Sequence, residues 1–251
     1  MHELHRTKRL AKIKLIACTS VIGVTKNKNM KPPKKHSFFY RNSLSLVFLL
    51  IFLVTLGAQA YAGWKEHNRE LQDNNAKELN FSTYLKSGHF ISATFENFES
   101  EFLQMALYVL LTVKLRQLGS AESKSLDEEE EVDREPVPSE DAPWAVKKGG
   151  WILKLYSNSL GIAFFILFFV SWSIHLYGSW QDHNVEQILN NKPKDDVLSF
   201  LTQPTFWFET FQNWQSEFLS VLAIVFLTIY LRQKGSPESK PVDAPHMETG
   251  K

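Results

Sequence analysis

This sequence has almost no cysteine. Cys18 is the single cysteine among 251 residues, and one thiol excludes both an intrachain disulfide and a zinc site built from cysteines. The chain also lacks a glycine-rich phosphate loop, a serine–histidine–aspartate signature and the paired histidines of a zinc-protease helix. These absences favour a protein that is not an enzyme over an enzyme.

Charged side chains are missing from two long apolar runs. The first extends from Leu44 to Ala62 and the second from Leu160 to Gly178. Each approaches the roughly 20 residues that an α-helix needs to cross a bilayer. A core helix of a soluble protein would normally have polar side chains along one face. We therefore expect both runs to span a membrane.

Acidic side chains are nearly absent from the start of the chain. Residues 1–41 contain eleven lysines and arginines against one acid, Glu3. The positive-inside rule places such a segment in the cytoplasm, and we expect residues 1–39 to be disordered there. Contact with anionic lipid is an alternative role for this charge. The interleaved aromatic residues that stack on bases are missing, so no nucleic acid partner is expected.

The chain contains two copies of one unit. A shift of 116 positions aligns Tyr40–Lys124 with Tyr156–Lys240 without a gap, and 34 of the 85 aligned pairs are identical. Such a repeat has to be recognised before the fold is predicted. The identical pairs include Trp64 and Trp180, His67 and His183, Asn68 and Asn184, Glu70 and Glu186, Asn97 and Asn213, and Glu101 and Glu217.

Each unit contains a second, shorter apolar run. These runs extend from Phe102 to Leu115 and from Phe218 to Leu231. About 14 residues is short for a span, so we expect the helices to begin earlier, near Phe95 and near Phe211. A re-entrant or surface helix is the alternative.

The predicted fold is an all-α membrane protein with four transmembrane helices. They form two tandem helical-hairpin repeats, residues 40–124 and 156–240, related by a pseudo-two-fold axis along the membrane normal. Each repeat crosses twice, so both termini lie in the cytoplasm. We expect the acidic, proline-containing linker 125–155 to be disordered. Residues 241–251 form a polar C-terminal tail.

Asparagine and glycine mark the expected turns. The pairs Asn74–Asn75 and Asn190–Asn191 predict that the first helix of each unit continues past the bilayer before the chain turns. Gly119 and Gly235 follow Arg-Gln pairs, and glycine suits the left-handed position that ends a helix. A dock for lipid or a partner, formed by the two Glu-Ser-Lys endings, is the alternative function of these segments.

Polar residues recur on one face of the second helix of each unit. The stripes consist of Asn97, Glu101 and Gln104 in the first unit and of Asn213, Glu217 and Ser220 in the second. An ionisable residue inside a span usually faces the interior of the bundle. The stripes predict either hydrogen bonds at the outer interface or the lining of a pore. The neighbouring Glu96 and Glu99 correspond to Gln212 and Gln215, so their charge is not required in both units.

Two histidines are spaced three residues from a glutamate. Together with the stripe glutamates they resemble the ligand inventory of ferritin-like di-metal bundles. The six residues are His67, Glu70, Glu101, His183, Glu186 and Glu217. The order here is His-x-x-Glu rather than Glu-x-x-His, and capping beside Trp64 and Trp180 is the alternative. No cofactor is expected, and a di-metal site stays open as an alternative.

Three sequence strings resemble a known family. They are Glu-Ser-Glu-Phe-Leu from Glu99, Gln-Asn-Trp-Gln-Ser-Glu-Phe from Gln212, and the Arg-Gln-x-Gly-Ser-x-Glu-Ser-Lys ending of each unit. The family consists of small bacterial membrane proteins with two tandem two-helix units, known as a domain of unknown function. The resemblance covers about residues 36–246 and implies a multi-pass protein of the inner membrane, without any activity. Members begin close to Met30, so the first 29 residues depart from the pattern, and a start at Met1 or at Met30 stays open.

The expected function is therefore structural, interaction-related or envelope-related. The partners are the lipid bilayer and either further copies of this chain or another membrane protein. The first alternative is a small oligomeric transporter or channel lined by Asn97, Glu101, Asn213 and Glu217. The second alternative is the di-metal site.

Overall fold

A computed structural model describes residues 36–250 of the chain. Within that range every regular element is a helix. The expectations for Cys18, for Met30 and for most of the basic N-terminal segment lie outside the described residues. The chain divides into two compact units between Leu53 and Val54, and the tertiary contacts described below all lie in the second unit.

The two apolar runs lie in the two longest helices. These are α3 (Ser43–Asp73) and α8 (Ser159–Leu189), each of 31 residues. Both continue well beyond the apolar run and end at an asparagine turn, where Asn75 and Asn191 have φ angles of 57° and 55°. Asparagine tolerates this left-handed conformation better than most residues. The predicted turns are confirmed, as is the extension of both helices beyond their apolar runs.

The second helix of each unit is longer than expected. α5 (Gly88–Lys114) and α10 (Pro204–Tyr230) have 27 residues each and begin seven residues before Phe95 and Phe211 respectively. The predicted start was wrong because it ignored the local N-terminal signals. Ser87 accepts a hydrogen bond from the Phe90 N–H, and proline occupies the first turn of α10.

Short helices complete the two copies. α4 (Phe81–Tyr84) precedes α5, α9 (Val197–Leu201) precedes α10, and α2 (Phe38–Arg41) precedes α3. The bounds of α3 and α5 recur 116 positions later as those of α8 and α10. Within residues 36–250, α3 and α8 are the two helices that are long and apolar enough to cross a membrane.

Parts of the acidic linker are ordered. The short elements there are η1 (Glu131–Asp133), α6 (Trp144–Lys148) and α7 (Gly150–Ser157). Lys124 forms an ion pair with Asp133, and α6 buries Ala145 and Val146. The expectation of a wholly disordered linker was wrong at these elements. Burial of a few apolar side chains and an ion pair stabilise short ordered segments between the acidic residues.

Arginines rather than glycines terminate α5 and α10. The Arg116 Nη1 donates to the Val113 carbonyl at 3.1 Å, and the Arg232 Nη1 donates to the Thr228 carbonyl at 3.0 Å. Gly119 and Gly235 do have positive φ angles, 82° and 85°, but in turns after the helices have ended. The arginines lie at the negative ends of the helices as predicted, whereas the prediction that the glycines end the helices was wrong.

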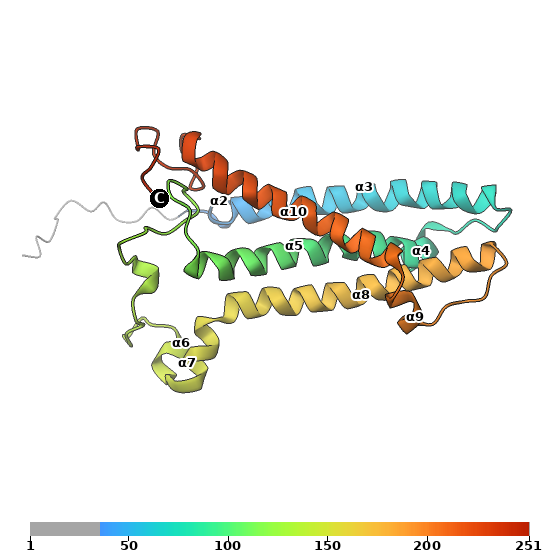
Figure 1. Cartoon of the computed structure of the whole chain (residues 1–251), viewed down its shortest axis with the longest axis horizontal. Coiled ribbons are helices and arrows are strands. Elements are labelled where there is room, and N and C mark those ends of the chain that lie inside the picture. Colours follow the sequence, from blue (N-terminus) through green and yellow to red (C-terminus); the bar gives the residue numbers. More distant parts are fainter. Residues whose placement is uncertain (1–35, 251) are drawn as a thin grey trace, which may run out of the picture. The chain divides into compact units, whose positions relative to one another are not determined.

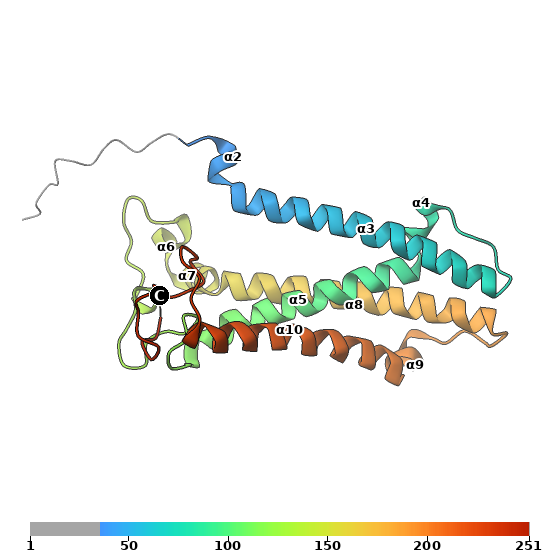
Figure 2. The same cartoon turned by 90° about the horizontal axis from the view of Figure 1, so that it is seen from above.

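α5 and α8 pack with their backbones in close contact. They lie side by side and antiparallel in both views (Figures 1 and 2), and the start of α5 meets the end of α8. A Cβ added at Gly88 would lie 2.5 Å from the Asp182 backbone nitrogen. One added at Gly178 would lie 2.6 Å from the Ser92 nitrogen. The absence of a side chain at these glycines therefore sets how closely the two helices approach.

Tryptophan and asparagine pairs fasten the loop after each long helix. The Trp64 indole and the Asn68 amide both donate to the Leu79 carbonyl, at 2.7 and 2.9 Å. Trp180 and Asn184 donate in the same way to the Asp195 carbonyl, at 2.8 and 3.1 Å. These repeated residues therefore hold the loop against the helix end.

Gly178→Ala tests the helix contact. The added methyl group would meet the α5 backbone, so we expect a loss of about 1–3 kcal/mol in the free energy of unfolding. The matched control is Gly57→Ala, because a Cβ there has nothing within 4 Å. It should stabilise by roughly 0.5–1 kcal/mol through helix propensity. Chemical denaturation followed by helical circular dichroism measures both; equal effects at the two glycines would contradict the close contact.

Candidate functional site

A histidine and a glutamate are completely buried between α8 and α5. His175 and Glu99 both have an exposed fraction of 0%. Their His175 Nδ1 and Glu99 Oε2 atoms lie 3.0 Å apart. The same close helix approach that requires Gly178 brings these two side chains together. Buried ionisable groups are tolerated when they are paired and hydrogen-bonded in this way.

Glu99 is held on both sides. Its Oε1 accepts a hydrogen bond from the Trp214 indole of α10 at 3.2 Å. Its Oε2 is the partner of His175 Nδ1. A carboxylate beside Nδ1 holds the proton on that nitrogen, so the lone pair of the neutral imidazole lies on Nε2.

The His175 Nε2 atom points between two further carboxylates. Glu96 Oε2 and Glu209 Oε2 each lie 3.9 Å from it, too far for a hydrogen bond, and Nε2 has no hydrogen-bond partner in the described part of the chain. The Ser179 hydroxyl donates to Glu209 Oε2 at 3.0 Å. The atoms of His175, Glu96 and Glu209 that could coordinate a metal ion all lie within 4.8 Å of one another. We call His175, Glu96, Glu99 and Glu209 the His175 cluster.

The sequence analysis missed this cluster. It set aside Glu96 and Glu99 because the second copy has glutamines there, and it assigned no role to His175 or Glu209. The signal that could have found the site is the single imidazole inside a run without any charge, from Leu160 to Gly178.

A second polar cluster lies where the end of α3 meets the start of α5. The His67 and His89 rings are 4.8 Å apart between centroids, and His89 Nδ1 lies 3.1 Å from the Tyr84 hydroxyl. His67 Nδ1 lies 3.7 Å from Glu70 Oε2. These histidines, Glu70, Asp182 and Glu186 line a cavity of about 560 Å³. His67, Glu70 and His89 could also approach one ion, but Glu70 is largely exposed, with 59% of its side chain accessible.

Burial shifts the titration of this second cluster. It raises the pKa of Asp182 to about 6; Glu186, Glu70 and Glu209 add to the rise, and His67 opposes it. Burial and the nearby His89 lower the pKa of His67. Both groups are therefore held toward their neutral forms.

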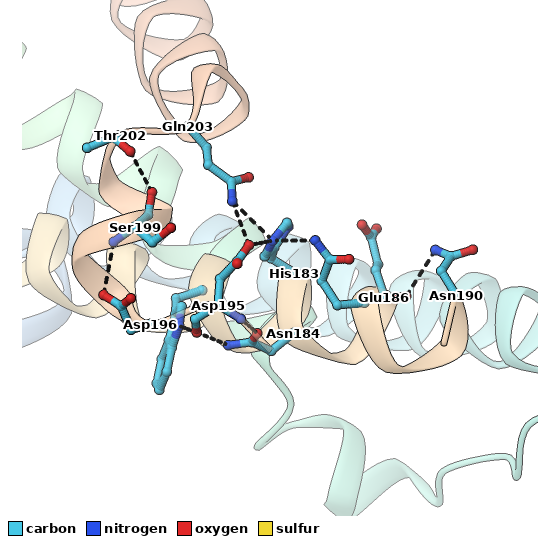
Figure 3. Close-up of polar contacts among 11 residues, drawn as sticks. His183, Asn184, Glu186, Asn190, Asp195, Asp196, Ser199, Thr202 and Gln203 are labelled. Carbon is cyan, nitrogen blue, oxygen red and sulfur yellow. Dashed lines mark hydrogen bonds and ion pairs between the residues drawn. The ribbon is translucent and has the colours of Figure 1, made fainter. Parts of the chain in front are cut away.

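His183 belongs to a different group from His67. Figure 3 shows the His183 ring and the Gln203 amide converging on Asp195, where Nε2 and Oδ2 are 2.8 Å apart and the amide donates at 2.7 Å. The hydrogen bond with His183 is the largest cause that lowers the pKa of Asp195. Glu186 instead accepts from the Asn190 amide at its backbone carbonyl, at 3.0 Å.

The predicted stripes of α5 and α10 face each other in part. The Gln104 amide donates to the Ser220 hydroxyl at 3.3 Å, and Glu101 lies close enough to Glu217 to repel its charge. The two asparagines do not join them. Asn97 and Asn213 donate to the carbonyls of their own helices, at 2.9 and 3.2 Å.

The six residues of the di-metal hypothesis therefore lie in three places. His67, Glu70 and Glu186 line the cavity, His183 binds Asp195, and Glu101 and Glu217 belong to the stripes of α5 and α10. No group of metal-type ligands in residues 36–250 contains His183, Glu101 or Glu217.

The lysines of the two Glu-Ser-Lys endings bind within the chain. Lys240 is 2% exposed, and its Nζ donates to the carbonyls of Gly119, His246 and Glu248 at 2.5, 2.8 and 2.8 Å. Lys124 pairs with Asp133. These contacts tie the C-terminal tail to the turn after α5.

A family model described as a domain of unknown function, DUF6766, matches residues 35–251. The chain belongs to this family. The resemblance to a domain of unknown function is thereby confirmed, and the DUF6766 match covers every helix of the structure. The comparisons with curated proteins and with solved structures gave no match. The function has to be inferred from the geometry of the DUF6766 chain itself.

Asp182→Asn tests the burial of that carboxyl group. A raised pKa means that the unfolded chain releases this proton near pH 4 and the folded chain near pH 6. Stability should therefore fall as the pH rises through this window. Asparagine cannot ionise, so we expect the variant to gain up to about 3 kcal/mol at pH 7 and little at pH 4. Denaturation at both pH values measures the difference, and an equal effect at pH 4 and pH 7 would contradict the shift.

Proposed function

We propose that this protein is a multi-pass protein of the bacterial inner membrane with a structural or interaction role. In this proposal α3, α5, α8 and α10 all cross the bilayer and both termini lie in the cytoplasm. The observation that carries it is the uncovered apolar surface of the helices in the second unit. Their contacts with one another leave whole faces of large apolar side chains exposed.

α8 has an exposed apolar face beside its packed one. Leu160, Ile166 and Phe169 have exposed fractions of 59, 58 and 59%. Transferring such surface into water costs about 25 cal/mol per Å², and soluble monomers rarely expose contiguous patches larger than a few hundred Å². Lipid acyl chains would cover this face without cost.

α10 also exposes apolar side chains on the side away from α5. Leu219, Leu222 and Phe226 have exposed fractions of 64, 61 and 54%. At 1.5 Å per residue, a helix of 27 residues is about 40 Å long, more than the roughly 30 Å of hydrocarbon. The polar residues that lower the hydropathy of α5 and α10 lie partly in the contact between helices, as in Gln104 and Ser220.

The charges support one orientation. Lys114 and Arg116 follow the apolar part of α5, and Lys147, Lys148 and Lys154 precede α8. The asparagine turns lie at the opposite ends of α3 and α8. The positive-inside rule then places the linker in the cytoplasm and the turns outside.

An interaction role follows from the same surfaces. Four helices with modest loops offer no large soluble domain, whereas exposed faces of α8 and α10 can pack against neighbours in the bilayer. The partner is a second copy of this chain or another membrane protein. Nucleic acid is not a partner in this proposal.

Cysteine labelling tests the topology. Cys18→Ser removes the single cysteine, after which single cysteines replace Asn75, Asn191 or Glu129. We expect an impermeant thiol reagent to label the first two in intact cells, and the third only after the membrane is permeabilised. The chain should also stay in the membrane fraction at alkaline pH and dissolve in detergent. Labelling of Asn75 and Asn191 from opposite sides, or release without detergent, would refute the proposal.

A second candidate function is an oligomeric pore. It is favoured by the Gln104–Ser220 hydrogen bond between the two stripes and by the electrostatic repulsion between Glu101 and Glu217 on the same two helices. Asn97 and Asn213 would continue this lining only after turning from their own helix carbonyls.

Glu101→Gln combined with Glu217→Gln tests the pore. We expect cation flux into liposomes to fall by at least about tenfold, because the two charges that attract a cation are removed. Glu66→Gln, an exposed glutamate outside the stripe, is the control and should leave the flux unchanged. Flux that is absent in the parent protein, or equal in all three, would eliminate this candidate.

A further inference from the structure

We propose that the His175 cluster binds a divalent first-row transition-metal ion of the zinc or manganese type. The ligands are the His175 Nε2 atom and one carboxylate oxygen each from Glu96 and Glu209. Glu99 is a positioning residue that acts through His175. This proposal goes beyond membrane insertion and does not depend on the number of spans.

The ligand atoms already lie nearly where an ion requires them. Nε2 is 3.9 Å from the closer oxygen of each carboxylate. Two ligand atoms of a tetrahedral zinc ion lie about 3.4 Å apart, since each is about 2.0–2.1 Å from the metal. His175 is fixed by complete burial, whereas the Glu96 and Glu209 side chains are 24 and 35% exposed. A small movement of these two side chains would complete the site.

The free Nε2 atom is the second, independent observation. It is buried and has no hydrogen-bond partner in the described residues, and buried polar atoms rarely stay unpaired in folded proteins. Because Glu99 holds the Nδ1 proton, the Nε2 lone pair is available to an ion. A carboxylate behind a histidine, which the Trp214 indole fixes in turn, is the arrangement found behind many metal-bound histidines.

The charges of the cluster also favour a bound cation. Three carboxylates surround one imidazole, and like charges at these distances repel strongly in a poorly solvated site. A divalent ion would neutralise Glu96 and Glu209 and leave Glu99 to its two hydrogen bonds. Imidazole together with carboxylate suits zinc, manganese and iron better than soft copper(I). Three protein ligands would leave a coordination position for water.

The symmetry-equivalent position in the repeat, where the two copies exchange roles, lacks all four of these groups. The positions equivalent to Glu96, Glu99, His175 and Glu209 hold Gln212, Gln215, Gln59 and Ala93. Gln59 donates an ordinary hydrogen bond to the Ala93 carbonyl at 3.2 Å. The chain thus replaces the cluster by neutral groups at the equivalent place, which indicates that its four members act as one set.

Metal binding by the purified full-length chain tests the proposal. Protein without a histidine tag is stripped with a chelator in detergent and dialysed separately against Zn²⁺ and Mn²⁺. We expect one tightly bound ion per chain by elemental analysis. Glu96→Gln and Glu209→Gln should each weaken binding by at least about tenfold. Glutamine has nearly the same shape as glutamate, and Gln212 stands at the position equivalent to Glu96, so the helical circular dichroism should not change.

The role of Glu99 has its own measurement. Glu99→Gln should weaken binding by about 10- to 100-fold and shift the visible spectrum of the Co²⁺-loaded protein, because the tautomer and orientation of His175 change. A residue that only filled space would not alter that spectrum. An unchanged spectrum with unchanged affinity would overturn the positioning role.

Two controls separate this site from other histidines. His183→Gln removes a histidine of the same helix that binds Asp195, and it should leave metal binding intact. His67→Gln with His89→Gln disables the second cluster and should also leave it intact. The proposal is overturned if the parent protein binds no ion, if the Glu96 and Glu209 variants bind as tightly as the parent, or if binding is lost with His67 and His89.

Discussion

The backbone contact between α5 and α8 determines most of the structure around it. Gly88 and Gly178 have no room for a side chain, so the two helices approach until backbone meets backbone. At that separation His175 and Glu99 come within 3.0 Å of each other. A wider separation would leave two buried ionisable groups without their partners. The contact and the buried pair therefore support each other: the glycines permit the approach, and the pair gives the buried charges their partners.

The polar interior and the apolar exterior follow from the same arrangement. α8 turns His175 and Gly178 toward α5 while Leu160 and Phe169 face outward. A helix with this pattern is the reverse of a helix on the surface of a water-soluble domain, where the apolar stripe is the buried one. This inversion supports the proposed membrane location, in which lipid would cover the exposed apolar face while small and polar residues collect at the helix contacts.

The sequence predicted the local features and missed the site. Runs without charge, together with Asn75 and Asn191, were sufficient for the long helices and their turns, because these depend on neighbouring residues alone. The linker elements and the starts of α5 and α10 depend on individual helix-capping residues and ion pairs. Composition and hydropathy do not reveal such single contacts. The His175 cluster joins α5 of the first copy to α8 and α10 of the second. A search for polar residues that both copies share overlooks this cluster, because none of its four members is repeated at the equivalent position of the other copy.

The backbone carbonyl groups that surround the Lys240 ammonium group give the C-terminal residues a structural role. Its ammonium group is buried and donates hydrogen bonds to the backbone carbonyls of Gly119, His246 and Glu248. Proteolytic trimming ahead of His246 would remove two of those acceptors and leave a positive charge stranded beside the turn after α5.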